Sequence, residues 1–207
     1  MAAKRSRDEL TVYGYMNKQR NILLSDKIIP NEIDEIIFEF YYIKFGWDLD
    51  ISSKHVKITE NICQQMTKDK VVPYAHVYGN DEINEGIKTW KIKAHDIVGS
   101  SDLFIGIIAQ QNIRADLHNF FRDKLGFGVY NFGWCFGNDG AQKKFIGCKY
   151  RDGDLVTMTL DLDKQTLHYK INENDIGNIP FTIPKGNTYR LVCATYINGV
   201  KYEIMDG

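Results

Sequence analysis

The sequence contains no C-x-x-C pair and no apolar segment of membrane length. Its cysteines, Cys63, Cys135, Cys148 and Cys193, lie far apart in the chain, a spacing that does not suit zinc, a thioredoxin-type redox pair or a disulfide-dense secreted module. The longest apolar runs, such as residues 104–109, are far shorter than the ~20 residues of a membrane-spanning helix. Because no signal segment opens the sequence, we expect reduced thiols and a cytoplasmic protein, with the nucleus as the alternative location.

Charge of one sign is also lacking. The formal net charge is -1, and the basic residues are spread out except for Lys4-Arg5-Ser6-Arg7, which we interpret as a solvated tail. A nucleic-acid-binding domain normally shows a basic stripe in its sequence. Composition therefore indicates neither nucleic acid nor a membrane as a partner, while a hydrophobic content of 43% is enough for a sizeable core.

Signatures of catalysis and of cofactor binding are missing as well. Residues 32–35, Glu-Ile-Asp-Glu, begin like the carboxylate strand of sandwich-fold glycosidases, but position 37 is Ile37 where the third acid is needed. Residues 161–172 begin like a calcium loop but lack its central Gly and its final Glu. No two histidines have metal-ligand spacing. We therefore expect no catalytic residue, no metal and no cofactor.

The glycine-rich stretch FGWCFGNDGAQK at 132–143 raises the question of whether its glycines bind a phosphate. No Lys-Ser or Lys-Thr follows them, so the stretch does not match a phosphate-binding loop. Residues 138–140, Asn-Asp-Gly, suit a tight turn with positive φ, and aromatic residues alternate along 130–136. This pattern predicts a strand that enters a β-hairpin.

The apolar pattern divides the chain into two parts. Over residues 30–43, apolar side chains that include Ile33, Ile36, Ile37, Phe40 and Tyr41 follow helical spacing and predict an amphipathic helix. From about residue 53, short β-branched or alternating runs separated by Gly, Asn and Asp predict an antiparallel sandwich. The predicted strands are 55–63, 71–78, 87–93, 103–109, 129–136, 144–149, 155–161, 166–171, 189–196 and 200–205. We therefore expect an all-β fold over residues 51–207, preceded by an extension over 1–50 that carries the helix.

Four segments between residues of about 76 and 206 form a recognisable series: HVYGNDEINEGIKTWKIK at 76–93, LFIGIIA at 103–109, NFGWCFGNDG at 131–140 and GDLVTMTLDLDKQTLHYKINENDIGNIPF at 153–181. In these segments the chain resembles the SPRY domain. The last segment is the most specific, and the four follow the order and spacing of the family. The resemblance implies a twisted, concanavalin-like two-sheet antiparallel β-sandwich without catalytic residues, in which loops at one edge bind a partner protein or a short peptide.

The resemblance also places the peptide surface of the family on particular residues of this chain. These are Tyr78, Gln110, Gln111, Phe120, Tyr196 and Asn198. Aromatic rings supply buried area at low entropic cost, and amides pair with an extended backbone. Tyr78 and Tyr196 also suit the core, and Asn198 also suits a simple turn, so two interpretations stand for each. We assign Trp90 and Trp134 to the core.

The first 50 residues lie outside this resemblance. IIPNEIDEIIFEFY at 28–41 faintly resembles the opening helix of an F-box, and SPRY domains occur in substrate receptors of ubiquitin ligases. A substrate-recruiting adaptor with ubiquitin-ligase components as partners is therefore a second hypothesis, although we favour a helix that packs on the sandwich. A glycan-binding sandwich protein is the third hypothesis. The leading prediction is a eukaryotic, non-catalytic protein–protein interaction module.

Overall fold

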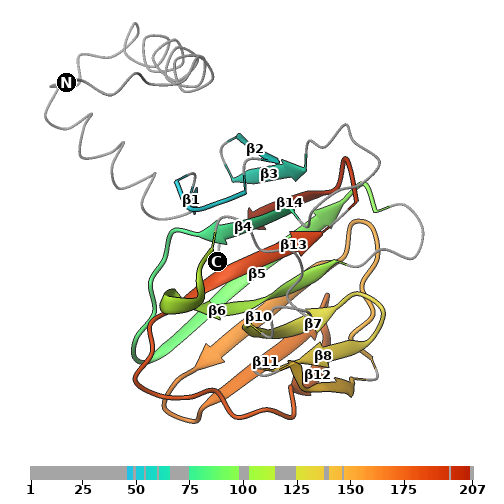
Figure 1. Cartoon of the computed structure of the whole chain (residues 1–207). Helices are drawn as coiled ribbons and strands as arrows, with labels where there is room; N and C mark the ends of the chain where they lie inside the picture. Colours follow the sequence, from blue (N-terminus) through green and yellow to red (C-terminus); the bar gives the residue numbers. More distant parts are fainter. Residues whose placement is uncertain are drawn as a thin grey trace, which may run out of the picture. The chain divides into compact units, whose positions relative to one another are not determined.

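Two antiparallel sheets make up the part of the protein that the structure describes (Figure 1). The structure is a computed structural model that describes residues 46–48, 50–53, 55–59, 61–65, 75–97, 103–114, 125–137, 140–145, 147–195 and 197–205. All of these residues belong to one compact unit, Ile43–Gly207. The helix predicted over 30–43 lies outside the described residues, so it stays a prediction.

Each sheet contains seven strands. Sheet A has the order β1-β4-β13-β6-β7-β8-β9, with β1 (Trp47–Asp48), β4 (Ala75–Gly79), β6 (Phe104–Ala109), β7 (Phe127–Tyr130), β8 (Trp134–Phe136), β9 (Gln142–Lys144) and β13 (Tyr189–Thr195). Sheet B has the order β12-β11-β10-β5-β14-β3-β2, with β2 (Val56–Thr59), β3 (Ile62–Gln65), β5 (Ile87–His95), β10 (Leu155–Asp161), β11 (Thr166–Ile171), β12 (Asn174–Asn178) and β14 (Lys201–Met205). A 3-10 turn, η1 (Gln110–Asn112), follows β6. The predicted two-sheet antiparallel sandwich is confirmed.

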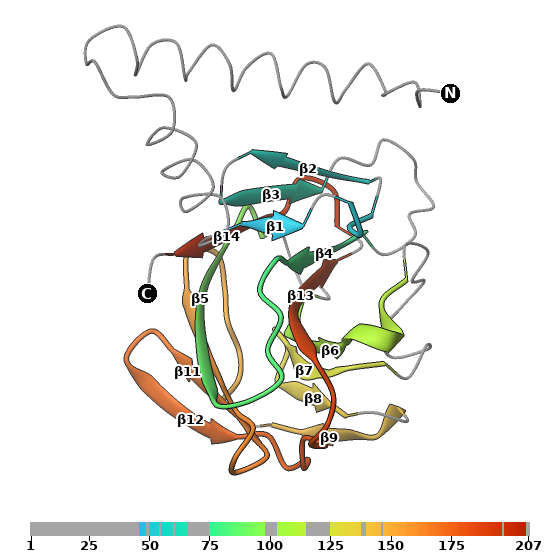
Figure 2. The same ribbon diagram turned by 90° about the vertical axis from the view of Figure 1, so that its left-hand side faces the viewer.

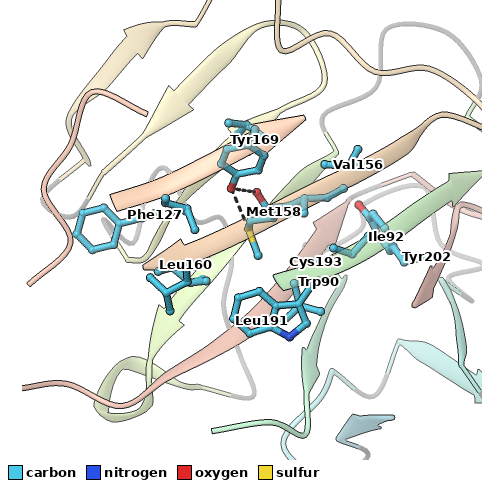
Figure 3. Packing of buried hydrophobic residues seen from close by; sticks show 14 of the residues in the cluster. Trp90, Ile92, Phe127, Val156, Met158, Leu160, Tyr169, Leu191, Cys193 and Tyr202 are labelled. Atoms are coloured by element: carbon cyan, nitrogen blue, oxygen red, sulfur yellow. Dashed lines mark hydrogen bonds between the residues drawn. The ribbon is translucent and has the colours of Figure 1, made fainter. Parts of the chain in front are cut away.

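The main core lies between the two sheets, which face each other in Figure 2. Sheet B contributes Trp90 and Met158, and sheet A contributes Leu191, among the buried side chains seen in Figure 3. The phenol of Tyr169 crosses this core from β11 and donates a 3.0 Å hydrogen bond to the carbonyl oxygen of Ile105 in β6. Because the phenol is fully buried, this bond ties the two sheets together where no water can replace it.

Sheet A is apolar on both of its faces. Strands β4, β6, β7 and β13 are buried along their whole length, which explains why segments such as 103–109 read as continuous apolar runs. Inward-facing residues such as Ile105 belong to the main core. Outward-facing residues form a second group, here called the outer cluster, which consists of Tyr78, Phe104, Ile108, Tyr130, Phe136, Val192 and Ala194.

Sheet B has only one apolar face. In β5 the buried residues Trp90, Ile92 and Ala94 alternate with more exposed ones, and β10, β11 and β14 show the same alternation. A period of two is expected for a strand that packs one face on a core and turns the other to water. The outer face of sheet B is therefore polar.

The best-predicted part of the fold is the pair of strands 155–161 and 166–171, which the structure reproduces as β10 and β11. The turn between them is held by Asp161, whose carboxylate accepts 2.8 Å hydrogen bonds from the backbone and the side chain of Lys164. These bonds, the side-chain one first, lower the pKa of Asp161. The acidic residues that begin like a calcium loop thus form a hairpin turn.

Three predicted strands are wrong in their extent. Of the strand predicted over 144–149, only Lys144 lies in a strand, at the end of β9, and residues 145 and 147–149 belong to no strand. The strand predicted over 129–136 is interrupted by a turn at 131–133, where Gly133 has a φ of 89°, so it divides into β7 and β8. The strand predicted over 55–63 divides into the paired strands β2 and β3. Strand β12 was not predicted, because its Asn, Asp and Gly residues are rare in strands. Strand β1 lies before residue 51, so the sandwich begins earlier than the predicted boundary.

The hairpin predicted within FGWCFGNDGAQK is confirmed. Strands β8 and β9 pair antiparallel, with Phe136 opposite Gln142, and Gly140 between them has a φ of 73°. Gly133 and Gly140 therefore allow the chain to turn, while Gly137 leaves room for the ring of Phe181.

All four cysteines are free and buried in the structure. Burial raises the pKa of Cys135 to about 11 and that of Cys148 to about 12. A protonated, buried thiol is a poor nucleophile and behaves as a small apolar side chain. The cysteines are therefore core residues.

A pair of glycines lets the outer cluster pack closely on sheet A. Gly106 of β6 and Gly128 of β7 are cross-strand partners, and the ring of Phe104 lies against both of them. A Cβ atom at Gly128 would approach Cζ of Phe104 to 2.5 Å and the carbonyl oxygen of Ile105 to 2.6 Å. These two positions exclude a side chain because ring and backbone already occupy the space.

We expect Gly128→Ala to destabilise the fold by about 2–3 kcal/mol, the upper part of the range typical of overpacked cores, because the added Cβ meets backbone as well as ring atoms. Gly86→Ala is the matched control, because its Cβ meets no atom within 4 Å and carries only the strain of a φ of 73°, about 1 kcal/mol. Denaturant unfolding of both variants measures the difference. An equal or smaller loss for Gly128→Ala would contradict the close approach.

Candidate functional site

The loops at the two ends of sheet A are the candidate binding surfaces. In the register of this sheet, Ala109 lies opposite Tyr189, and Ala75 lies opposite Thr195. The turn after β4, the η1 turn and the segment before β13 therefore meet at one end of the sheet. The turn between β13 and β14 lies at the other end.

The predicted binding residues do not all lie at one end. Gln110 and Gln111 belong to η1, whereas Asn198 belongs to the turn after β13. The seven residues of β13 separate these ends by about 20 Å. Phe120 and Tyr196 lie outside the described residues, so their part in binding stays a prediction. A single compact peptide site that includes both Gln110 and Asn198 is therefore excluded.

Tyr78 lies in the core. Its exposed fraction is 0%, because β4 is buried on both faces and the ring belongs to the outer cluster. The Tyr78 hydroxyl donates a 3.2 Å hydrogen bond to the carbonyl oxygen of Arg114, and burial raises the pKa of this phenol above its usual value. Of the two interpretations of Tyr78, the structure supports the core, and the prediction of a binding side chain is corrected.

The two tryptophans also differ in their places. Trp90 lies in the main core, with an exposed fraction of 5%, as predicted. Trp134 is only partly buried, and it packs on the outer cluster instead of the main core. Its strand, β8, is near the edge of sheet A, so part of the indole stays in contact with water.

Arg190 organises the first end of the sheet. This side chain points outward from β13, is only 10% exposed, and forms ion pairs with Asp48 at 2.7 Å and with Glu82. Its Nε donates a 2.8 Å hydrogen bond to the side-chain oxygen of Gln110, and one terminal nitrogen also lies 3.3 Å from the carbonyl oxygen of Gly79. One buried guanidinium therefore fixes side chains from β1, from the turn after β4 and from η1.

Backbone hydrogen bonds connect the same loops. Ile83 and Tyr189 exchange backbone hydrogen bonds of 2.9 and 2.7 Å, and the Gln110 amide donates to the carbonyl oxygen of Thr188 at 2.8 Å. The side-chain amide of Gln111 donates a 2.8 Å hydrogen bond to Asn187. We call the residues Glu82, Gln110, Gln111 and Asn187 the η1 surface. Its loops are held in place by one another.

Part of the hydrogen-bonding capacity of the η1 surface is not used. Gln110 and Gln111 are both exposed. Arg190 occupies the side-chain oxygen of Gln110, and Asn187 occupies the side-chain nitrogen of Gln111. Among the described residues, the nitrogen of Gln110 and the oxygen of Gln111 have no partner, so neighbouring residues present one donor and one acceptor.

The described residues show no site for a metal ion, because no three His, Cys, Asp or Glu side chains gather among them. Within the same part of the chain, no helix is long and apolar enough to cross a membrane. The acidic groups of the η1 end, Asp48 and Glu82, are engaged by Arg190.

Solved structures share this fold, although no protein-family model and no curated protein matches the sequence. The SPRY domain of human HERC1 is similar with a TM-score of 0.63 and 15% sequence identity, over 78% of this chain and 98% of that chain. The TRIM65 PSpry domain gives 0.60 and 16%, over 84% of this chain and 98% of that chain. A human SPRY domain gives 0.56 and 11%, over 73% and 94% respectively.

These similarities show that the described unit has the SPRY fold, as the sequence motifs predicted. The sequence identities of 11–16% are too low to transfer individual binding residues. Binding by this chain therefore depends on its own loop side chains and not on those of the similar structures.

Sequence reasoning missed Arg190, Glu82 and Asn187. One signal was available, since Arg190 is the single charged residue in the apolar run of β13, and a buried charge needs a partner. Its partners Asp48 and Glu82 lie more than a hundred residues earlier, so only the strand register identifies them.

We expect Arg190→Ala to destabilise the protein by about 2–3 kcal/mol, because it removes a buried cation and leaves its carboxylate partners without compensation. Lys88→Ala is the control. Lys88 pairs with Asp81 and is 34% exposed, so its loss is expected to cost less than about 1 kcal/mol. Denaturant unfolding measures both, and similar losses would show that Arg190 does not organise this end.

Proposed function

We propose that this protein is a non-catalytic interaction module that binds an extended segment of a partner protein at the η1 surface. The observation that carries the proposal is the pair of exposed glutamines, Gln110 and Gln111, each oriented by an internal hydrogen bond and each with an unused amide atom. A donor and an acceptor side by side match the C=O and N–H groups of a peptide backbone.

The rigidity of the loops favours such binding. Arg190, the Ile83–Tyr189 backbone pair and the bond from Gln111 to Asn187 hold the surface before a partner arrives. A surface that is already ordered loses little conformational entropy on binding. The half-exposed carboxylate of Glu82 adds an acceptor for a backbone N–H or a cationic side chain at the rim.

The SPRY fold supports the same class of function. The resemblance to this family implies that loops at one edge of the sandwich bind proteins or peptides, and the η1 surface is built from such loops. The adaptor hypothesis depends on the predicted helix over 30–43, which lies outside the described residues, and no described contact favours it. Glycan binding likewise has no observation in its favour.

The test is selection of peptides from a displayed random library on the intact protein, followed by affinity measurement on a Gln110→Ala/Gln111→Ala variant. Loss of two hydrogen bonds of about 1 kcal/mol each should weaken selected peptides by about tenfold to thirtyfold. Fluorescence anisotropy with labelled peptides measures this loss of affinity.

Asn198→Ala is the matched control, because it removes an exposed amide at the opposite end of sheet A. It should leave the affinity unchanged. The Gln110→Ala/Gln111→Ala variant loses the hydrogen bond to Arg190 and should unfold at a somewhat lower denaturant concentration, so affinities are compared under conditions in which every variant is fully folded. Peptides that bind the glutamine variant normally but lose affinity for Asn198→Ala would move the site to the other end. Failure to select any peptide would reject the proposed function.

A further inference from the structure

The outer face of sheet B collects lysines from strands that are distant in sequence. The alternation and register of β2, β5, β10, β11 and β14 define which residues lie on this face. Its basic residues are Lys57, Lys91, Lys93, Lys170, Lys201, His95 and His168. The sequence shows no basic stripe, because the sheet and not the chain order brings these side chains together.

The centre of this face is a triangle of lysines. Lys91 and Lys170 both lie opposite Thr157, one on each side of β10, so their Cα atoms are separated by two strand spacings, about 10 Å. Lys93 lies two residues beyond Lys91 on the same face, about 7 Å away. Three ammonium groups are thus carried within reach of one short peptide segment.

These lysines are not neutralised within the described part of the chain. Lys201 pairs with Asp96 at 2.7 Å, and His95 pairs with Glu203 at 2.9 Å. No described carboxylate lies within ion-pair distance of Lys91, Lys93 or Lys170, by contrast. Their charge is available to a partner.

Two carboxylates lie among the lysines and give the face a definite pattern. Glu203 is the cross-strand partner of Lys93 and accepts from His95, while Asp175 is the cross-strand partner of Lys170 and lies 3.0 Å from His168. Both acids are therefore directed to histidines. Around them the lysines form separate positive points instead of a uniform positive surface.

Apolar side chains lie between the charges. Leu155 is opposite Lys93, and Met205 is opposite Lys91, and both are partly exposed. Together with the aliphatic stems of the lysines, they offer apolar contact beside each ammonium group. The Trp and Tyr residues of these strands, such as Trp90 and Tyr169, point into the core. The described face therefore offers no Trp, Tyr or Phe ring on which a nucleic-acid base can stack, and its two imidazoles are paired with Glu203 and Asp175.

We propose that the outer face of sheet B, centred on Lys91, Lys93 and Lys170, is a second binding surface, which takes an acidic, extended segment of a partner protein. Carboxylates at alternate positions of an extended chain are about 7 Å apart, which matches Lys91 and Lys93. A uniformly anionic membrane suits the face less well, because Glu203 and Asp175 would face its charge. The surface is independent of the η1 surface, since the two lie on different sheets.

The test is fluorescence anisotropy at low ionic strength with a labelled peptide of alternating glutamate and serine. The intact wild-type protein should bind this peptide and lose affinity as salt is added. Lys91→Glu/Lys170→Glu should weaken binding by tenfold or more, because each attraction becomes a repulsion. Lys91→Gln/Lys170→Gln should show a smaller loss in the same direction, and it guards against a folding defect in the reversed variant.

The matched control is Lys149→Glu/Lys185→Glu, which changes the net charge equally at exposed positions outside the strands of sheet B. It should keep the affinity within about twofold of the wild type, since screened charges at a distance contribute little. Equal losses in both charge-reversed variants would overturn the proposal, as would undiminished binding to Lys91→Glu/Lys170→Glu. Absence of peptide binding by the wild type would also overturn it, whether or not single-stranded DNA or anionic vesicles bind. The Gln110→Ala/Gln111→Ala variant should bind this peptide normally, so the two proposals fail separately.

Discussion

The constraint on which the structure depends is that sheet A must bury both of its faces. One face packs against sheet B, and the other carries the outer cluster, which partly buried residues such as Ile51, Ile113 and Leu125 help to cover. Loops next to sheet A are therefore held by apolar contacts as well as by hydrogen bonds. This explains how irregular segments acquire the fixed geometry seen at the η1 surface.

Arg190 marks the border between the apolar outer cluster and the polar η1 surface. Its backbone belongs to an apolar strand, while its guanidinium lies among Asp48, Glu82 and Gln110. Such a group is costly to bury and is tolerated because nearly every donor has an acceptor. Arg190 thus pairs with the carboxylates at this end of the sheet. It also orients the side chain of Gln110, which is exposed to solvent.

The two surfaces proposed for binding rest on different physical effects. At the η1 surface, oriented amides with unused atoms favour a partner with complementary hydrogen bonds, which gives selectivity at short range. On the outer face of sheet B, unpaired lysines act over about 10 Å at moderate ionic strength and accelerate the approach of acidic partners. In these proposals, the outer face of sheet B attracts an acidic segment and the η1 surface recognises an extended segment. The two segments can belong to one partner or to two different partners.

Much of the fold was predictable from sequence, because strands such as 155–161 and 103–109 have clear alternation or continuous apolar character. The breaks within 55–63 and 129–136 were not predictable, since a short turn in an otherwise β-rich segment leaves little trace. The candidate site was harder to predict from the sequence than the fold. Gln110 and Gln111 were found through the family resemblance, but Arg190 and the lysine face depend on partners brought together by register. Tyr78 shows the opposite error. It lies next to a loop in the sequence and was predicted to bind a partner, but its strand, β4, is buried on both faces, so its ring belongs to the core.

The strand order has a consequence for how the protein is made. Strand β13 lies between β4 and β6 in sheet A, and β14 lies between β5 and β3 in sheet B. An interior position of each sheet is thus filled by a strand that leaves the ribosome after all the other described strands of that sheet. Until then, apolar segments such as β6 have no partner on one side, and contacts of such long sequence separation form slowly. We therefore expect the incomplete chain to expose apolar strands for a time, which favours aggregation and chaperone binding.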